Sequence, residues 1–127
     1  CGAPTLLIAE CVLVYMPPEQ GTELLRWAGS TFEHAAFVSY DPMHPDDAFG
    51  RMMVHNLKRR GCVLRAIHEF KTEEDYRKRY LSNGWDQTRV LNMRQVYDSH
   101  ADPVERKRIA AIEPLDELEE WNMILEH

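Results

Sequence analysis

The residues best suited to chemistry are Glu10 and Tyr15, which lie in the middle and near the end of an apolar run. Residues 4–16 read PTLLIAECVLVYM. A strand buried on both faces is nearly continuous Val, Ile and Leu, so this run predicts a buried parallel strand. The Glu10 carboxylate then either points into solvent at the strand's carboxyl end or lies in the crevice where open α/β sheets bind ligands. We favour the crevice.

Tyr40 and Asp41 are a second candidate pair, because they end the next β-prone segment, AFVSY at 36–40. The carboxyl ends of parallel strands lie at one edge of a sheet, so these two side chains could line the same crevice as Glu10. A strand end followed by a proline turn, Asp41-Pro42, accounts for the same residues equally well. Both interpretations remain open.

The other polar groupings favour ordinary structural roles. His44, Asp46 and Asp47 are close in sequence, but no second set of ligands accompanies them, so we predict no metal site. The remaining histidines are dispersed and no nucleophile motif accompanies them, which argues against a catalytic triad. The cysteines form no CxxC pair, which argues against a disulfide framework and a zinc site and fits a reducing, intracellular setting. These dispersed residues are His55, His68, His100, Cys1, Cys11 and Cys62.

Strand and helix signals alternate in the first half of the chain. Pro17-Pro18 predicts the start of a helix that continues to about residue 32, and Asp46 is the expected N-cap of a helix that reaches Arg60 before Gly61. The second of these helices is expected to bury a stripe that includes Met52 and Met53. This order predicts right-handed βαβ units, that is, an α/β fold with a parallel sheet covered by helices on both faces.

The second half of the chain is expected to be more helical. Thr72 to Asp75 forms a capping-box pattern, and the helix that it opens is expected to close near Asn83-Gly84. Residues 85–91 alternate enough to predict one more strand. Asp102-Pro103 and Asp116 are expected to begin two further helices.

Charge and length limit the function classes. The chain has 127 residues, a length that fits one domain, and a formal net charge of -6, which disfavours a nucleic-acid surface. Its basic cluster, residues 58–60, is more simply a helix C-terminus whose cations complement the dipole. The sequence contains no run of about 20 apolar residues and no signal-peptide pattern, so a soluble protein is expected.

Four blocks of sequence resemble the leucine carboxyl methyltransferase family, and their order and spacing match it along nearly the whole chain. The blocks are Pro4–Tyr15, His44–Gly50, Leu81–Trp85 and Glu113–Trp121. The resemblance implies a Rossmann-like class I methyltransferase fold and S-adenosylmethionine as cofactor. It also implies methylation of the C-terminal leucine α-carboxylate of the protein phosphatase 2A catalytic subunit.

The resemblance also implies roles for single residues. Glu10 matches the strand glutamate that contacts S-adenosylmethionine, and Tyr15 matches a position beside the cofactor and the substrate carboxylate, where it would act as a catalytic and substrate-binding residue. Tyr40 and Asp41 are candidates for the substrate side of the crevice because of their place at the next strand's carboxyl end, and not because of the resemblance. The family's glycine-rich cofactor loop and last strand have no counterpart here, so we expect residues 1–127 to be the C-terminal part of one methyltransferase domain, inactive alone, monomeric and cytoplasmic.

Two other hypotheses stay open. A sister enzyme of the same superfamily, the tRNA wybutosine-synthesizing methyltransferase, carries similar blocks. The acidic charge balance leans only weakly against it. The chain could also be a non-catalytic interaction module that lacks the cofactor-binding half. The first hypothesis predicts tRNA retention at moderate salt, and the second predicts no cofactor binding at any concentration.

Overall fold

The protein was analysed as a computed structural model, which describes residues 2–112 and 115–127. The chain divides into two compact units, Cys1–Val90 and Leu91–His127, and each is described by itself. Cys1 and the first two residues of the last family-like block, Glu113 and Pro114, lie outside the described residues.

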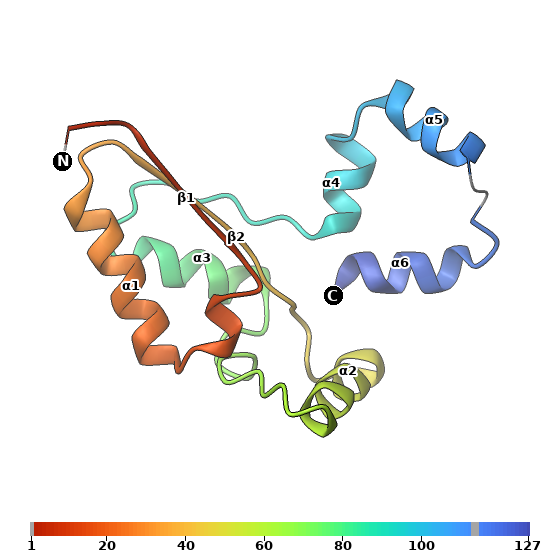
Figure 1. Ribbon diagram of the computed structural model, residues 1–127, viewed down its shortest axis with the longest axis horizontal. Coiled ribbons are helices and arrows are strands. Elements are labelled where there is room, and N and C mark those ends of the chain that lie inside the picture. The colour runs from red at the N-terminus through yellow and green to blue at the C-terminus, as the bar shows by residue number, and fades with distance from the viewer. Residues whose placement is uncertain (1, 113–114) are drawn as a thin grey trace. The chain divides into compact units, whose positions relative to one another are not determined.

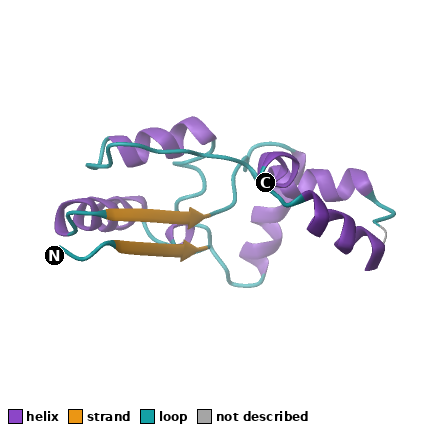
Figure 2. Ribbon diagram, turned by 90° about the horizontal axis from the view of Figure 1, so that it is seen from above, coloured by secondary structure: helices purple, strands orange, loops and turns teal. Residues whose placement is uncertain are grey.

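The first unit is built on two parallel strands, β1 (Thr5–Glu10) and β2 (Ala35–Tyr40), which run in the same direction in Figure 2. Helix α1 (Pro18–Thr31) lies between them in the chain, with Pro17 and Pro18 at its start as predicted. The register pairs Thr5 with Ala35 and Glu10 with Tyr40. The predicted strand–helix–strand order and the second strand are therefore confirmed, and the fold is α/β with a small parallel sheet.

The first strand is shorter than the apolar run predicts. β1 ends at Glu10, the next residue, Cys11, has a φ of 49°, and a 3₁₀ helix, η1 (Leu13–Tyr15), follows. The run stays apolar because η1 is itself buried: Leu13 is 0% and Val14 1% exposed. Placing Tyr15 on the strand was wrong, since two buried elements in succession give the same sequence pattern as one long strand.

One face of the sheet forms the core of this unit. Helices α1 and α3 (Glu73–Leu81) lie on the same side of the strands in Figure 1. Ala9, Leu13, Leu25 and Tyr80 form a buried cluster against that face. The other face is apolar but exposed: Leu6 is 61% and Ile8 72% exposed. Among the described residues of this unit, helices therefore cover one face and not the predicted two.

Helix α2 (Ala48–Arg59) begins one residue later than predicted. Its N-cap is Asp47, whose carboxylate accepts a hydrogen bond from the Gly50 amide at 2.7 Å. Asp46 was the wrong choice, because its carboxylate binds the Lys71 ammonium at 2.8 Å. The helix ends before Gly61, whose φ of 81° favours glycine, as predicted.

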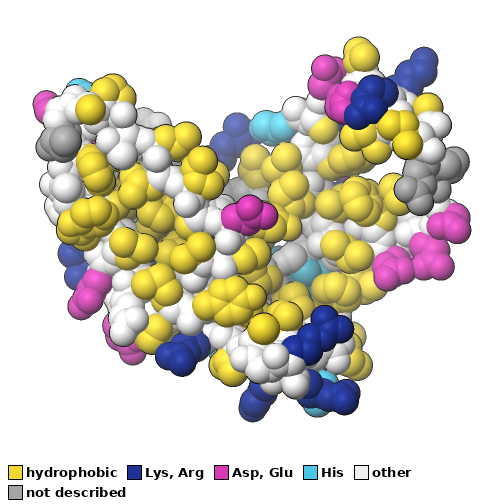
Figure 3. All heavy atoms as spheres, viewed as in Figure 1, with side chains coloured by type: hydrophobic (Ala, Val, Ile, Leu, Met, Phe, Trp, Pro, Cys, Tyr) yellow, Lys and Arg dark blue, Asp and Glu magenta, His cyan; other side chains and the backbone are white. Residues whose placement is uncertain are grey.

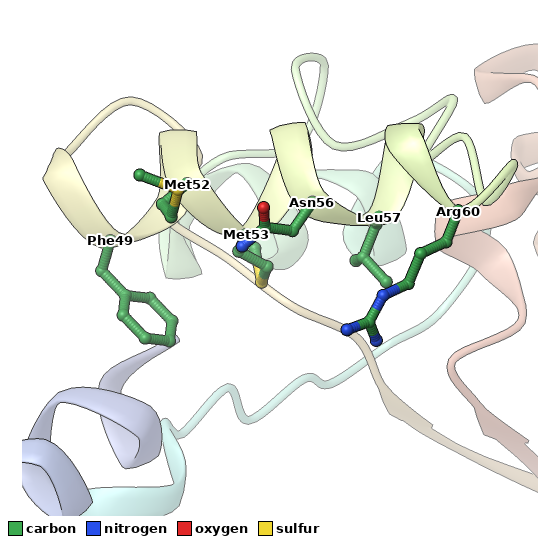
Figure 4. Close-up of a pocket in the computed structure, with 6 residues that line it drawn as sticks. All are labelled: Phe49, Met52, Met53, Asn56, Leu57 and Arg60. Carbon is green, nitrogen blue, oxygen red and sulfur yellow. The ribbon is translucent and has the colours of Figure 1, made fainter.

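The methionines of α2 are not core residues of this unit. Met52 is 58% exposed, whereas Val54 and Leu57 pack against the buried cluster of Val14, Leu64 and Ile67. Figure 4 shows a cavity of about 300 Å³ along this helix, lined by Phe49, Met52, Met53, Asn56, Leu57 and Arg60. Lys and Arg side chains gather over the same helix in Figure 3.

Replacing Gly50 by Ala is expected to destabilise the protein by about 1–3 kcal/mol. A Cβ at Gly50 would overlap the backbone carbonyl oxygen of His44 and lie 2.7 Å from the Cα of Pro45, so backbone must move. Thermal unfolding followed by circular dichroism measures the loss. Gly2→Ala is the control, because its Cβ would meet only a Glu33 carboxylate oxygen at 3.8 Å. Equal melting temperatures for the two variants would contradict the expectation.

Helix α3 begins as predicted, with Thr72 and Asp75 forming a capping box. The predicted strand over residues 85–91 is wrong, because these residues form no strand. Trp85 instead packs inward: its indole N–H donates to the Leu25 carbonyl at 3.1 Å and its ring meets Phe37 edge-on at 5.9 Å. This packing anchors the start of the segment to helix α1 and the covered face of the sheet.

The described residues of the second unit form three helices, α4 (Met93–Ser99), α5 (Pro103–Ile112) and α6 (Leu118–Glu126). Helix α4 was not predicted, although Asn92 and Gln95 form a capping box at its start. Asp102 accepts from the Val104 amide at 2.9 Å, which confirms the predicted start of α5. Helix α6 has Glu117, not Asp116, as its N-cap, and Trp121 packs edge-on against Tyr97 of α4.

None of the helices within residues 2–112 and 115–127 is long and apolar enough to cross a membrane.

Candidate functional site

Glu10 and Tyr40 lie side by side at the carboxyl edge of the sheet. They are register partners, and the Cys11 amide donates to the Tyr40 carbonyl at 2.7 Å, which closes the pairing just after them. Both belong to the alternating exposed positions of their strands, and Tyr40 is 52% exposed. The structure therefore brings a carboxylate and a phenol together on one open surface, at the edge where parallel sheets bind ligands.

Tyr15 is presented by the η1 turn and not by a strand. Its side chain is 41% exposed, while the two preceding residues, Leu13 and Val14, are buried. The turn is held by its backbone: the Val14 amide donates to the Asp41 carboxylate at 3.2 Å, and the Val14 carbonyl accepts from the Ala66 amide at 3.0 Å. An exposed phenol on a firmly held backbone suits a residue that orients a ligand.

Asp41 differs from the other candidates because its carboxyl group is turned partly inward. One oxygen accepts from Val14, and the other is buried without a hydrogen-bond partner among the described residues. Burial raises the pKa of Asp41 to about 6, although the Val14 amide and the positive charge of Arg79 act in the opposite direction. Asp41 therefore changes charge close to neutral pH, while it contacts the turn that carries Tyr15.

The contribution of Asp41 to the stability of the protein is expected to fall as the pH rises from about 4 to 6. The pKa of Asp41 in the folded state, about 6, lies above its ordinary value of 3.8, so the folded state holds the proton more tightly in this window. Linkage then makes ionisation destabilising, by at most about 3 kcal/mol at 1.4 kcal/mol per pKa unit, and by less because the side chain is partly exposed. Urea unfolding between pH 4 and 7 measures the slope.

Asp41→Asn is expected to remove most of this slope, because the amide does not titrate. Asp46→Asn is the matched control, since Asp46 is exposed. The pKa of Asp46 is lowered by its hydrogen bond to Lys71, so its contribution is expected to have the opposite sign. A wild-type slope that survives in Asp41→Asn would contradict the expectation.

Arg79 was missed by the sequence analysis. It is only 4% exposed, and its guanidinium lies over the Phe70 ring, 3.9 Å from the ring centroid. Tyr76, Arg79 and Tyr80 are the buried residues of α3, at helical spacing. An arginine within an otherwise aromatic stripe was the available signal, because a cation rarely occupies a buried helix face unless it has a specific role there.

The polar groups around His44 do not converge on a metal site. Among the described residues, no group of three or more His, Cys, Asp or Glu side chains could hold a metal ion. His44 lies 3.8 Å from Glu73, and His68 lies 3.8 Å from Asp46. The α2 cavity is lined by neither Glu10 nor the candidate tyrosines.

The chain is similar in sequence to known proteins over nearly its whole length. No protein-family model matches the chain. Leucine carboxyl methyltransferase 1 of Bos taurus is 46% identical over 124 residues, which cover 98% of this chain. The leucine carboxyl methyltransferase 1 homolog of Arabidopsis thaliana is 43% identical over the same share. The chain belongs to the leucine carboxyl methyltransferase family.

The similarity covers only part of the length of each relative. The chain spans 37% of the length of the cattle and Arabidopsis proteins and matches their C-terminal part. The human tRNA wybutosine-synthesizing protein 4 is 38% identical over 126 residues, 99% of this chain and 18% of that protein. The proteins similar to this chain thus include leucine carboxyl methyltransferases and a tRNA wybutosine-synthesizing protein.

Proposed function

We propose that this chain is the C-terminal part of a Rossmann-like class I methyltransferase. The enzyme would transfer a methyl group from S-adenosylmethionine to the C-terminal leucine α-carboxylate of the protein phosphatase 2A catalytic subunit, in the cytoplasm. The main support for the proposal is the sequence similarity to leucine carboxyl methyltransferases over nearly the whole chain. It is supported by an exposed carboxylate, Glu10, at the carboxyl edge of a parallel pair of strands.

The residues at this edge fit the proposed cofactor. When bound, S-adenosylmethionine supplies a methyl group on a positively charged sulfur. The Glu10 carboxylate can accept hydrogen bonds from the cofactor's donors, and its negative charge favours the cation. Because its side chain is exposed beside Tyr40, a ligand can reach it without rearrangement of the core.

The substrate needs little activation. A C-terminal carboxylate has a pKa of roughly 3.3 to 3.7, so at neutral pH it is already a nucleophile and requires no general base. The protein must hold the carboxylate in line with the methyl group and exclude water. Tyr15 can donate a hydrogen bond to one carboxylate oxygen, and Tyr40 and Asp41 can line the substrate side of the crevice.

A chimera tests the proposal. This chain replaces the matching part of the cattle relative, and methyl transfer from radiolabelled S-adenosylmethionine to a peptide ending in leucine is measured. Label that is released as methanol by mild base is expected, because a methyl ester is base-labile. The same peptide with a C-terminal amide is the control and is expected to take up no label. A folded chimera that binds cofactor and labels neither peptide would overturn the proposed substrate class.

Two alternatives are outcomes of the same chimera. The similarity to the human tRNA wybutosine-synthesizing protein 4 supports a tRNA carboxyl methyltransferase, which would label tRNA and not the peptide. A non-catalytic interaction module would label neither the peptide nor tRNA in the chimera, and the chain alone would bind neither S-adenosylmethionine nor S-adenosylhomocysteine at any concentration. Monomeric behaviour of the active chimera in size-exclusion chromatography is part of the proposal.

A further inference from the structure

We propose that Asp41 and Arg79 are positioning residues that fix the η1 turn and so set the place of Tyr15. This inference rests on the proposed function, in which Tyr15 orients the substrate carboxylate. Neither residue needs to touch the substrate for this role. Their action passes through the backbone of Val14, which immediately precedes Tyr15.

Asp41 joins the end of β2 to the turn after β1. It directly follows Tyr40, the last residue of β2, and its carboxylate accepts from the Val14 amide, 27 residues earlier in the chain, at 3.2 Å. The Val14 carbonyl accepts from the Ala66 amide. Both backbone polar groups of Val14 are therefore bound by distant segments, so the orientation of Tyr15 depends on tertiary contacts more than on the short 3₁₀ helix itself.

Arg79 places a buried positive charge near Asp41, without a hydrogen bond between the two side chains. Its Nε and Nη2 atoms are buried and have no hydrogen-bond partner among the described residues. The second carboxylate oxygen of Asp41 is likewise buried without a partner there. A buried charge is costly unless an opposite charge compensates it. Burial lowers the pKa of Arg79 and raises the pKa of Asp41, and the charge of each residue acts in the opposite direction on the other.

The place of the Arg79 guanidinium is fixed by its neighbours. It lies over the Phe70 ring, and the absence of a side chain at Gly21 of α1 makes room for it, since a Cβ there would overlap Nη2. The Arg79 carbonyl accepts from the Asn83 side chain at 2.7 Å. Such confinement is expected for a group whose charge must stay at one place.

The other titratable groups around Asp41 keep one charge state near neutral pH. These are Tyr76 and Tyr80 of α3, Cys11 after β1, and Arg79. Burial raises the pKa of both tyrosines and of Cys11, so they stay neutral, and Arg79 stays protonated. A titration of this cluster between pH 5 and 8 therefore reports on Asp41.

The test combines a spectroscopic and a kinetic measurement on the chimera. The ¹⁵N–¹H signal of the Val14 amide is followed between pH 5 and 8, and its titration midpoint is expected near 6. Arg79→Met keeps a long apolar side chain in place of the arginine but removes the charge, so the midpoint should move to higher pH. The KM for the leucine peptide at pH 7 should then rise about 10-fold or more, with a smaller change in S-adenosylhomocysteine affinity.

Three further variants define the controls. Arg77→Met, on the exposed side of the same helix where Arg77 pairs with Glu74 at 3.2 Å, should change neither the midpoint nor KM. Arg79→Lys keeps the charge and should restore most of the wild-type midpoint. If Arg79→Met fails to fold, Asp41→Asn still tests the inference. Asp41→Asn should abolish the Val14 titration.

An unchanged Val14 midpoint in a folded Arg79→Met, or a Val14 titration that persists in Asp41→Asn, would overturn the inference. A normal KM in a folded Arg79→Met would do the same. Failure of the proposed function looks different: the Val14 midpoint would still respond to Arg79→Met, while the wild-type chimera would transfer no methyl group to the peptide.

Discussion

Replacing Glu10 by Ala in the chimera is expected to weaken S-adenosylmethionine binding by roughly 10- to 100-fold. The carboxylate lies exposed at the end of β1, beside its register partner Tyr40. Hydrogen bonds to a charged group are worth about 1.5–3 kcal/mol, and each 1.4 kcal/mol is a factor of 10 in affinity. Because Glu10 is not part of the buried core, the melting temperature should change little.

Calorimetric titration with two ligands separates the charge of Glu10 from its hydrogen bonds. S-adenosylmethionine is a cation at sulfur, whereas S-adenosylhomocysteine is not. Glu10→Gln keeps an acceptor oxygen but removes the negative charge, so it should weaken binding of the cation more than binding of the neutral ligand. Glu23→Ala, on the exposed surface of α1, is the matched control. Equal affinities for wild type and Glu10→Ala would remove Glu10 from the site.

Replacing Leu13 by Ala is expected to lower the free energy of unfolding by about 2–5 kcal/mol. Leu13 is 0% exposed and packs with Ala9, Leu25 and Tyr80, so the truncation leaves a cavity between η1, the sheet and α1. The same cavity loosens the turn that carries Tyr15. Chemical unfolding measures the loss of stability, and the KM for the leucine peptide measures the effect on the turn.

Val12→Ala is the control for Leu13→Ala, since Val12 lies one residue away and is 46% exposed. Its loss of stability should stay within about 0.5 kcal/mol, as is usual for exposed positions. A cost for Leu13→Ala no larger than that for Val12→Ala would show that η1 is not anchored by its buried leucine.

Local signals in the sequence determined the elements whose causes are local. The proline start of α1, the capping box of Thr72 and Asp75, and the Asp102-Pro103 start of α5 were predicted correctly, because each depends on residues within one helical turn. Helix α2 is an exception, because its N-cap is Asp47 and not the predicted Asp46. Asp46 and Asp47 are adjacent and both can cap, and only the tertiary contact of Asp46 with Lys71 decides between them.

The candidate site divides in the same way. The order strand, helix, strand was enough to predict parallel pairing, and so to predict that Tyr40 lies at the edge where the first strand ends. It did not reveal that Glu10, in the middle of the apolar run, is the last residue of that strand and the register partner of Tyr40.

The end of β1 and the surroundings of Tyr15 and Asp41 depend on contacts between distant parts of the chain. The apolar run does not distinguish a long strand from a strand followed by a buried 3₁₀ turn, because both bury the same side chains. The hydrogen bond between Val14 and Asp41 joins residues that are 27 positions apart. Arg79 can be buried because its guanidinium lies over the Phe70 ring and Gly21 has no side chain that would overlap it. Such contacts depend on how distant elements pack, and no periodicity or capping pattern within one element encodes them.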